Sequence, residues 1–302
     1  MSYESQIKYF LRDDEAVGFN YEFGIKEIIY REKSNFQLIE IVDTVPFGRA
    51  LITDSIVMIT EMDEFIYHEM MTHVPMSLVE KPRKVLVIGG GDGGCVRELS
   101  KYPSLERIDL VEIDERIIDI TQKYMNTWKG TNFNILNTYI EDGFKFIQRT
   151  NEKYDVIILD ITAPVDIAID LYSKTSFGRV VSRLTDEGVF VIQSESVFIT
   201  PNVAKHILRQ VRDLVRFSSV YSVYVPSFIN PWSFVIGSKV NKPDIPKYEN
   251  IDYSKVKFYT KEIHTSSFAL PKFLKDFFDK EDDVKNLLDR SIVRTLLGQE
   301  VG

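Results

Sequence analysis

The pattern of apolar and polar residues changes near residue 60. Before that point, short runs rich in β-branched and aromatic residues occupy residues 23–30, 37–42 and 50–53, with turn-forming residues between them. This pattern predicts a small antiparallel sheet. Because so few strands cannot enclose a core of their own, we expect the sheet to pack on the rest of the chain or on a second subunit.

Strand and helix patterns alternate from about residue 85 to residue 238. We expect strands at residues 85–88, 108–112, 133–137, 155–159, 188–193, 219–225 and 232–237. We expect helices at residues 95–101, 115–124, 142–148, 172–184 and 202–214. This alternation predicts a doubly wound α/β fold with a mostly parallel seven-stranded sheet, whose last two strands form a hairpin at the edge.

Another helix is expected at residues 63–77. Its predicted buried side carries Phe65, Met70, Met71 and Val74. The patterns together divide the chain into three parts. These are a β-sheet domain at residues 1–62, a doubly wound α/β domain at residues 63–240, and a C-terminal extension at residues 241–302 with a helix at about 271–279.

Composition narrows the class of protein. The chain has 302 residues with a net charge of −8, which argues against nucleic acid or an anionic membrane as the main partner. Cys95 is the only cysteine, so no internal disulfide can form and a reducing compartment is indicated. The N-terminus lacks a signal-peptide pattern, and no apolar run reaches the roughly 18–20 residues that span a bilayer. We therefore expect a cytoplasmic protein.

The run Val85–Gly94 (VLVIGGGDGG) carries the sharpest local signal. Gly89, Gly91 and Gly94 have the G-x-G-x-x-G spacing of a nucleotide-binding turn between a strand and a helix. Such a turn usually offers its N–H groups to a phosphate, which Asp92 would repel. The loop therefore favours a ligand without phosphate and with a positive charge, such as a sulfonium or an amine.

Acidic residues follow five successive predicted strands: Asp92, Glu112, Asp142, Asp160 and Glu195. Ligands bind outside the carboxyl ends of the strands in an open α/β sheet, so these residues converge on one edge. Glu112 lies where an acid accepts hydrogen bonds from ribose hydroxyls, and Asp142 is placed to meet an adenine amino group. Asp92 and Asp160 are interpreted as a cation clamp beside a reacting centre.

Each acid also has a structural interpretation. Asp142 is equally well placed to cap a helix, and Asp114 and Glu115 are expected to be helix-start acids. Taken together, the carboxylates predict an adenosine-bearing cation with room for an amine. S-adenosylmethionine and its decarboxylated form both fit, and the acid in the glycine loop favours the decarboxylated form, whose tail ends in an ammonium.

With these residues in view, the chain resembles the polyamine aminopropyltransferase (spermidine synthase) family over about residues 20–240. Three stretches carry the resemblance: Thr60–Pro75 (TEMDEFIYHEMMTHVP), the Gly89–Gly94 loop, and Glu112–Asp114 with Asp142–Phe144. The resemblance implies a class I methyltransferase-like Rossmann fold. It also implies transfer of the aminopropyl group of decarboxylated S-adenosylmethionine, as co-substrate, to a diamine or polyamine, with release of methylthioadenosine.

The resemblance and the strand-end pattern together predict the site. The catalytic set is Asp160 as proton acceptor, with Tyr67 and Asp92. The nucleoside-binding set is Gln37, His68, Gly89, Gly91, Asp92, Glu112, Asp142 and Gly143. The amine-binding set is Tyr67, His68, Asp92, Asp160, Asp166, Gln193, Phe228 and Trp232.

Departures from the family pattern concern the acceptor amine. Ala163 replaces a carboxylate that usually helps to hold the amine, and Asp166 and Ile167 replace Gly-Pro. Phe228 stands where a tyrosine commonly meets the diamine. Asp166 either restores the missing charge or is a surface acid. These changes indicate a different acceptor, which the sequence leaves open among putrescine, agmatine, cadaverine, spermidine and longer amines.

Several alternatives stay open. The segment His68–His73 (HEMMTH) has its second histidine one position too late for a zinc helix, so we expect no metal, and His73 is expected to pack in the helix. Cys95 is expected to be a buried small residue.

Two rival functions stay open: a methyltransferase on the same fold and a non-catalytic binding paralogue. We expect no tightly bound cofactor. We expect the protein to form a homodimer or homotetramer.

Overall fold

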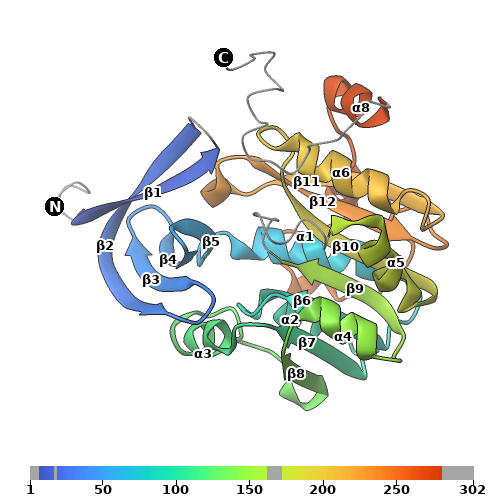
Figure 1. Ribbon diagram of the computed structural model, residues 1–302, viewed down its shortest axis with the longest axis horizontal. Coiled ribbons are helices and arrows are strands. Elements are labelled where there is room, and N and C mark those ends of the chain that lie inside the picture. The colour runs from blue at the N-terminus through green and yellow to red at the C-terminus, as the bar shows by residue number, and fades with distance from the viewer. Residues whose placement is uncertain (1–6, 17–18, 162–171, 281–302) are drawn as a thin grey trace.

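The computed structural model describes residues 7–16, 19–161 and 172–280 and contains two sheets (Figure 1). The first is a five-stranded antiparallel meander in which each strand pairs with the next in sequence. Its strands are β1 (Tyr9–Ala16), β2 (Phe19–Lys33), β3 (Leu38–Thr44), β4 (Gly48–Thr53) and β5 (Ile56–Thr60). The predicted antiparallel sheet is thus confirmed, with two further strands, β1 and β5, that the sequence analysis did not predict.

The second sheet has seven strands in the order β11-β12-β10-β9-β6-β7-β8. They are β6 (Lys84–Gly89), β7 (Arg107–Glu112), β8 (Leu136–Ile140), β9 (Tyr154–Asp160), β10 (Leu184–Ser196), β11 (Phe217–Tyr224) and β12 (Pro231–Ser238). The strands from β10 to β8 in this order run parallel, and β11 and β12 form an antiparallel hairpin at one edge. The predicted doubly wound α/β fold is confirmed.

Helices cover both faces of this sheet, because neighbouring strand residues point to opposite sides. One face, with Val85, Val87 and Val156, packs against α1 (Glu64–Met76) and α2 (Gly94–Leu99). The other face, with Leu86 and Ile157, packs against a second helical layer. That layer contains α4 (Gly143–Arg149), α5 (Lys174–Ser182), α6 (Pro201–Val211) and α8 (Lys272–Asp279).

The N-terminal sheet lies to one side of the larger sheet and is joined to it through α3 (Glu115–Tyr124) (Figure 1). Ile39, Ile41 and Leu51 of the small sheet pack against Ile117 and Ile120 of that helix. The small sheet therefore shares a core with the Rossmann-like part of the chain. None of the helices in the described ranges has the length and apolar content needed to cross a bilayer.

Two sequence expectations were wrong in detail. The strand expected at residues 133–137 begins only at Leu136, because Phe133–Ile135 form a 3₁₀ turn capped by the Asn132 side chain. Helix α1 was expected to bury one face, but its residues are buried almost all round, and Phe65 is one of the less buried. The reason is that residues 257–259 of the C-terminal extension, just before α7 (Lys261–Ser267), bind Glu69 of α1, and Tyr259 packs on His73.

Strands β6 and β9 form the point where the strand order reverses, because the chain continues from β6 to β7 on one side and β9 lies on the other. Ligands bind at such points in doubly wound sheets. At the carboxyl edge Gly89 pairs with Asp160, and the Gly90 N–H donates to the Asp160 carbonyl at 3.0 Å. This contact brings the glycine loop and Asp160 together.

Gly89 has φ +75°, and a Cβ there would lie 2.1 Å from the Asp160 carbonyl oxygen. We predict that Gly89→Ala lowers the free energy of unfolding by more than about 2 kcal/mol, because it adds strain at a positive φ to a clash with backbone. Gly178→Ala is the matched control, since a Cβ in that helical position meets nothing within 4 Å and should be neutral or stabilising. Urea denaturation of both variants measures the difference, and equal stabilities would contradict the prediction.

Candidate active site

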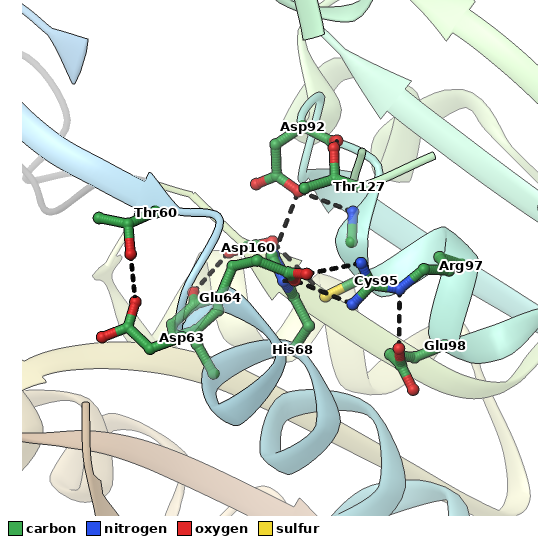
Figure 2. Close-up of polar contacts among 12 residues, drawn as sticks. Thr60, Asp63, Glu64, His68, Asp92, Cys95, Arg97, Glu98, Thr127 and Asp160 are labelled. Carbon is green, nitrogen blue, oxygen red and sulfur yellow. Dashed lines mark hydrogen bonds and ion pairs between the residues drawn. The ribbon is translucent and has the colours of Figure 1, made fainter. Parts of the chain in front are cut away.

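Helix α1 places Tyr67 and His68, two of the predicted site residues, at the carboxyl ends of β6 and β9. The Tyr67 hydroxyl donates to Asp160 Oδ1 at 2.5 Å, and the Cys95 thiol, at the start of α2, donates to Asp160 Oδ2 at 3.5 Å. Cys95 is buried, as expected. Asp160 is thus held from two sides by groups on two helices, and its side chain is fixed toward the glycine loop (Figure 2).

Asp92 is fixed within the loop and faces His68. Its Oδ1 accepts a hydrogen bond from the Gly94 N–H at 2.7 Å and lies 3.1 Å from His68 Nε2. The His68 ring occupies the space that a Cβ on Gly94 would need, 2.2 Å from its ring atoms. Gly94 therefore makes room for a functional side chain, which is a different task from cradling phosphate.

The surroundings of His68 favour its charged form. Its side chain is fully buried between two carboxylates, with Nδ1 2.6 Å from Glu64 Oε2 and Nε2 facing Asp92. Burial alone would lower the pKa of His68, but the two carboxylates raise it to about 10. The predicted pair of free carboxylates, Asp92 and Asp160, therefore has an imidazolium beside it, which the sequence analysis did not foresee.

Glu64 and Arg97 are functional candidates that the sequence analysis missed. Two hydrogen bonds of 2.7 and 2.8 Å join the Arg97 guanidinium to the two oxygens of Glu64. Arg97 also binds Glu98, which in turn binds His73, so His73 is a buried structural histidine. Glu64 precedes His68 by one helical turn and could have been found from that spacing. The contact of Arg97 with α1 has no local signal, because it joins separate helices.

The environment of Asp160 suits a proton acceptor. Burial and, next, the nearby Asp92 carboxylate raise the pKa of Asp160 to about 6, against the opposing effects of His68 and the Tyr67 hydrogen bond. A carboxylate with a raised pKa is a stronger base than an ordinary aspartate. Asp160 therefore combines basicity with a fixed orientation.

The predicted nucleoside side of the site centres on Glu112. Its carboxylate accepts hydrogen bonds from the Gly91 N–H at 3.2 Å and the Asp114 N–H at 3.0 Å, and burial raises its pKa to about 7. Gln37, from the N-terminal sheet, donates to Asp114 at 3.1 Å, so it lies close to Glu112. The Gly91 N–H is therefore already hydrogen-bonded within the protein. Asp114 caps α3, as expected.

Asp142 caps α4 through the N–H groups of Phe144 and Lys145, so the structural interpretation of this residue holds in the described contacts. Both capping bonds use Oδ1, and Oδ2 accepts no hydrogen bond from the described residues. Gly143 packs tightly against Ile88, where a Cβ would lie 2.1 Å from the isoleucine side chain. Both residues therefore lie at the carboxyl edge, and their contact with an adenine ring stays a prediction.

Aromatic side chains form a wall on the other side of Tyr67. Phe228 lies 6.1 Å from the Tyr67 ring and 4.7 Å from the Trp232 ring, measured between centroids. Gln193 is turned to the Ile161 carbonyl, to which it donates at 2.7 Å. Asp166, like Ala163 and Ile167, lies outside the described residues. Of the predicted amine-binding set, the structure thus brings Tyr67, His68, Asp92, Asp160, Phe228 and Trp232 to one place.

One group in the described part of the chain has the spacing of metal ligands: His68, Cys95 and Asp160, whose ligand atoms lie within 4.8 Å of one another. Metal binding would require a neutral His68 and a deprotonated Cys95. The raised pKa of His68 opposes the first, and burial, which raises the pKa of Cys95, opposes the second. The donor set therefore fits a metal poorly.

The fold and the site define a Rossmann-like class of enzyme with a buried carboxylate at the carboxyl edge of its parallel sheet. Residues 64–248 match the spermine/spermidine synthase domain, and residues 9–61 match the spermidine synthase tetramerisation domain. The chain belongs to the spermine/spermidine synthase family. The resemblance noted in the sequence is confirmed.

Similar proteins support the same assignment. The chain is 38% identical over 262 residues to a polyamine aminopropyltransferase of Desulforudis audaxviator, covering 86% of this chain and 95% of that protein. It is 34% identical to the polyamine aminopropyltransferase of Bacillus subtilis, covering 87% and 96%. A spermidine synthase crystallised with the transition-state analogue AdoDATO is similar with a TM-score of 0.82 and 31% identity, covering 90% and 95%. The spermidine synthase of Thermotoga maritima gives a TM-score of 0.81 at 31% identity, covering 89% and 94%.

The raised pKa of Asp160 predicts a pH-dependent stability difference. The folded protein holds this proton more tightly than the unfolded chain, so the contribution is present below pH about 4 and lost as pH rises through about 6. We predict that Asp160→Asn becomes more stable relative to wild type by up to about 3 kcal/mol between pH 4 and pH 7. Urea denaturation at several pH values measures it. Glu64→Gln should show the opposite trend, since the pKa of Glu64 is lowered to about 2, and a constant difference for Asp160→Asn would contradict the prediction.

Proposed function

We propose that the protein is an aminopropyltransferase that moves the aminopropyl group of decarboxylated S-adenosylmethionine to a diamine or polyamine and releases methylthioadenosine. The observation that carries this proposal is the buried Tyr67–Asp160 pair at the point where the strand order reverses. The relatives named above, which cover most of the chain, support the same reaction.

The nucleoside would bind along the carboxyl ends of β7 and β8. Glu112, once ionised, can accept hydrogen bonds from ribose hydroxyls, and the uncommitted oxygen of Asp142 can accept one from an adenine amino group. Gln37 lies beside them through Asp114. This arrangement would direct the sulfonium and its propyl chain toward the end of β6, where Asp92 and His68 lie.

The reaction would be an in-line displacement. The amine nitrogen forms a bond to the propyl carbon next to sulfur, the carbon–sulfur bond breaks, and its electron pair stays on sulfur as a neutral thioether. An alkyl amine has a pKa near about 10 and enters protonated, so it must first lose a proton. Asp160 takes that proton, with Tyr67 orienting the carboxylate. Because this proton transfer is uphill, the positioning of the two substrates must supply much of the reduction in the activation barrier, about 7–11 kcal/mol in favourable cases.

The acceptor would lie against the aromatic wall of Tyr67, Phe228 and Trp232. Such a wall suits the methylene chain of an aliphatic amine, and aromatic faces attract a distal ammonium. Putrescine, agmatine, cadaverine, spermidine and longer amines all share this chemistry. No nucleic acid, no membrane, no metal and no tightly bound cofactor are needed for the reaction.

Two rival functions are less well supported. A methyltransferase would bind the carboxylate of S-adenosylmethionine near the glycine loop. There the carboxylates of Asp92 and Asp160 outnumber the single positive charge of His68 and would repel it; binding of the carboxylated and decarboxylated compounds can be compared directly. A non-catalytic paralogue has no need for the Tyr67–Asp160 pair, and it would release no methylthioadenosine with any amine in a panel read by mass spectrometry.

We also propose that the protein is a homodimer or homotetramer in the cytoplasm. The segment at residues 9–61 matches a tetramerisation domain. At the edge of that sheet, Tyr9 and Phe10 of β1 are 55% and 64% exposed, which is unusual for large apolar side chains on an edge strand. A partner subunit on this edge would cover them.

Asp160→Asn removes the proton acceptor while keeping the shape of the side chain. We predict that kcat falls by at least about 100-fold, because general-base catalysis contributes about 10²–10⁴. The affinity for methylthioadenosine should stay within about threefold, since the nucleoside contacts lie elsewhere. Product formation by mass spectrometry and binding by calorimetry test both parts, and near-wild-type turnover would remove Asp160 as base.

Glu112 gives a second pH prediction. Ribose hydroxyls form their strong, charge-assisted hydrogen bonds with the ionised carboxylate of Glu112, whose pKa in the free protein is raised to about 7. We predict that the Kd of methylthioadenosine rises about tenfold per pH unit below pH 7 and is constant above pH 8. Calorimetry from pH 6 to pH 8.5 measures this. Asp142→Asn should weaken binding but keep the pH slope, and a flat profile in wild type would contradict the role of Glu112.

A further inference from the structure

A chain of buried charged side chains extends from His68 through Glu64, both on α1, to Arg97 on α2. His68, Glu64 and Arg97 have side chains that are 0%, 8% and 13% exposed. The Glu64 carboxylate binds His68 through one oxygen and Arg97 through both. Glu64 therefore connects the imidazole to a guanidinium that does not touch the reacting centre (Figure 2).

His68 is surrounded by acids from several elements. Glu64 and Tyr67 face it from its own helix, Asp92 from the loop after β6, Cys95 from α2 and Asp160 from the end of β9. Glu64 and Asp92 lie closest, at 2.6 and 3.1 Å. A buried imidazole with a carboxylate at each nitrogen is most stable as a cation.

We propose that Glu64 and Arg97 are positioning residues that keep His68 a fixed cation, and that this cation neutralises Asp92 and leaves Asp160 as the proton acceptor. The last part rests on the proposed function. The first part concerns the charge of His68 and can be tested without any reaction.

A proton relay through His68 is the competing interpretation, and the contacts oppose it. A relay would pass the Nδ1 proton to Glu64, but the bidentate contact with Arg97 holds that carboxylate ionised. The pKa values agree, since Glu64 is lowered to about 2 while His68 is raised to about 10. His68 therefore keeps its proton through the cycle.

The charge of His68 sets the behaviour of Asp160. Asp92 raises the pKa of Asp160, and His68 lowers it. If His68 lost its charge, two buried carboxylates would face each other, and one of them would take up a proton near neutral pH. A protonated Asp160 cannot accept the proton of the amine, so turnover would be lost at neutral pH and regained at higher pH.

Glu64→Gln tests the proposal, with Glu98→Gln as the matched control. Both remove a buried carboxylate that binds Arg97, but Glu98 contacts His73 and not His68. The chain has four histidines, so side-chain NMR of histidine-labelled protein can follow each one. We expect His68 to stay charged up to about pH 9 in wild type. In Glu64→Gln its midpoint should fall to about 7 or below, because burial then opposes the charge and only Asp92 supports it. Glu98→Gln should leave the His68 midpoint unchanged, because Glu98 does not contact His68.

Kinetics give the second readout. In Glu64→Gln the acid limb of the kcat–pH profile should move up by about one unit, so kcat falls about tenfold at pH 5 and about twofold at pH 7, with methylthioadenosine affinity within about twofold. Glu98→Gln should keep the wild-type limb. Arg97→Gln should reproduce the change in a weaker form and serves where Glu64→Gln does not fold.

Two results would overturn the proposal. A wild-type His68 that titrates near about 6.5 would show that it is not a fixed cation. A shift of the His68 midpoint without movement of the acid limb would show that its charge does not control Asp160. Wild-type protein without aminopropyl transfer would instead contradict the proposed function, and the NMR result would still decide the charge of His68.

Discussion

The contact between the His68 imidazolium and the Asp92 carboxylate is the interaction on which the rest of the site depends. Asp92 lies in the loop after β6, and Asp160 lies at the end of the neighbouring strand β9. Both carboxylates are largely removed from water. Two such carboxylates cannot both stay ionised without a nearby cation. The protein supplies this cation on α1, so the helix is an electrostatic part of the sheet's carboxyl edge as well as a packing element.

This requirement explains the shape of the glycine loop. Gly89 lets the loop cross the backbone of Asp160, and Gly94 leaves space for the His68 ring. In a phosphate-binding turn the same residues would keep N–H groups open for a ligand. Here the N–H groups of Gly91 and Gly94 bind Glu112 and Asp92 instead. The spacing of a nucleotide-binding motif is thus reused to place carboxylates.

Much of the fold and of the candidate site could be predicted from local sequence. Buried strands followed by acids located Asp92, Glu112 and Asp160, because parallel strands end at one edge. Contacts between distant elements could not be predicted: Arg97 meets Glu64 only because α2 packs on α1. The strand expected at residues 133–137 failed for a similar reason, since apolar residues there fit a strand or a turn equally well and Asn132 decides between them.

Helix α1 is fixed at its start and along its outer side, and the contact at its start connects the Tyr67–Asp160 pair to the aromatic wall. At its start, the Asp63 carboxylate accepts bonds from the Ser227 N–H at 2.6 Å and hydroxyl at 2.9 Å, next to Phe228. Further along, Glu69 accepts from three backbone N–H groups of residues 257–259 in the C-terminal extension. Tyr67 and His68 lie between these two anchors. A change in the β11–β12 connection is therefore expected to alter the aromatic wall and the orientation of α1 together. Under the proposed function, the choice of acceptor and the positions of Tyr67 and His68 would then be linked.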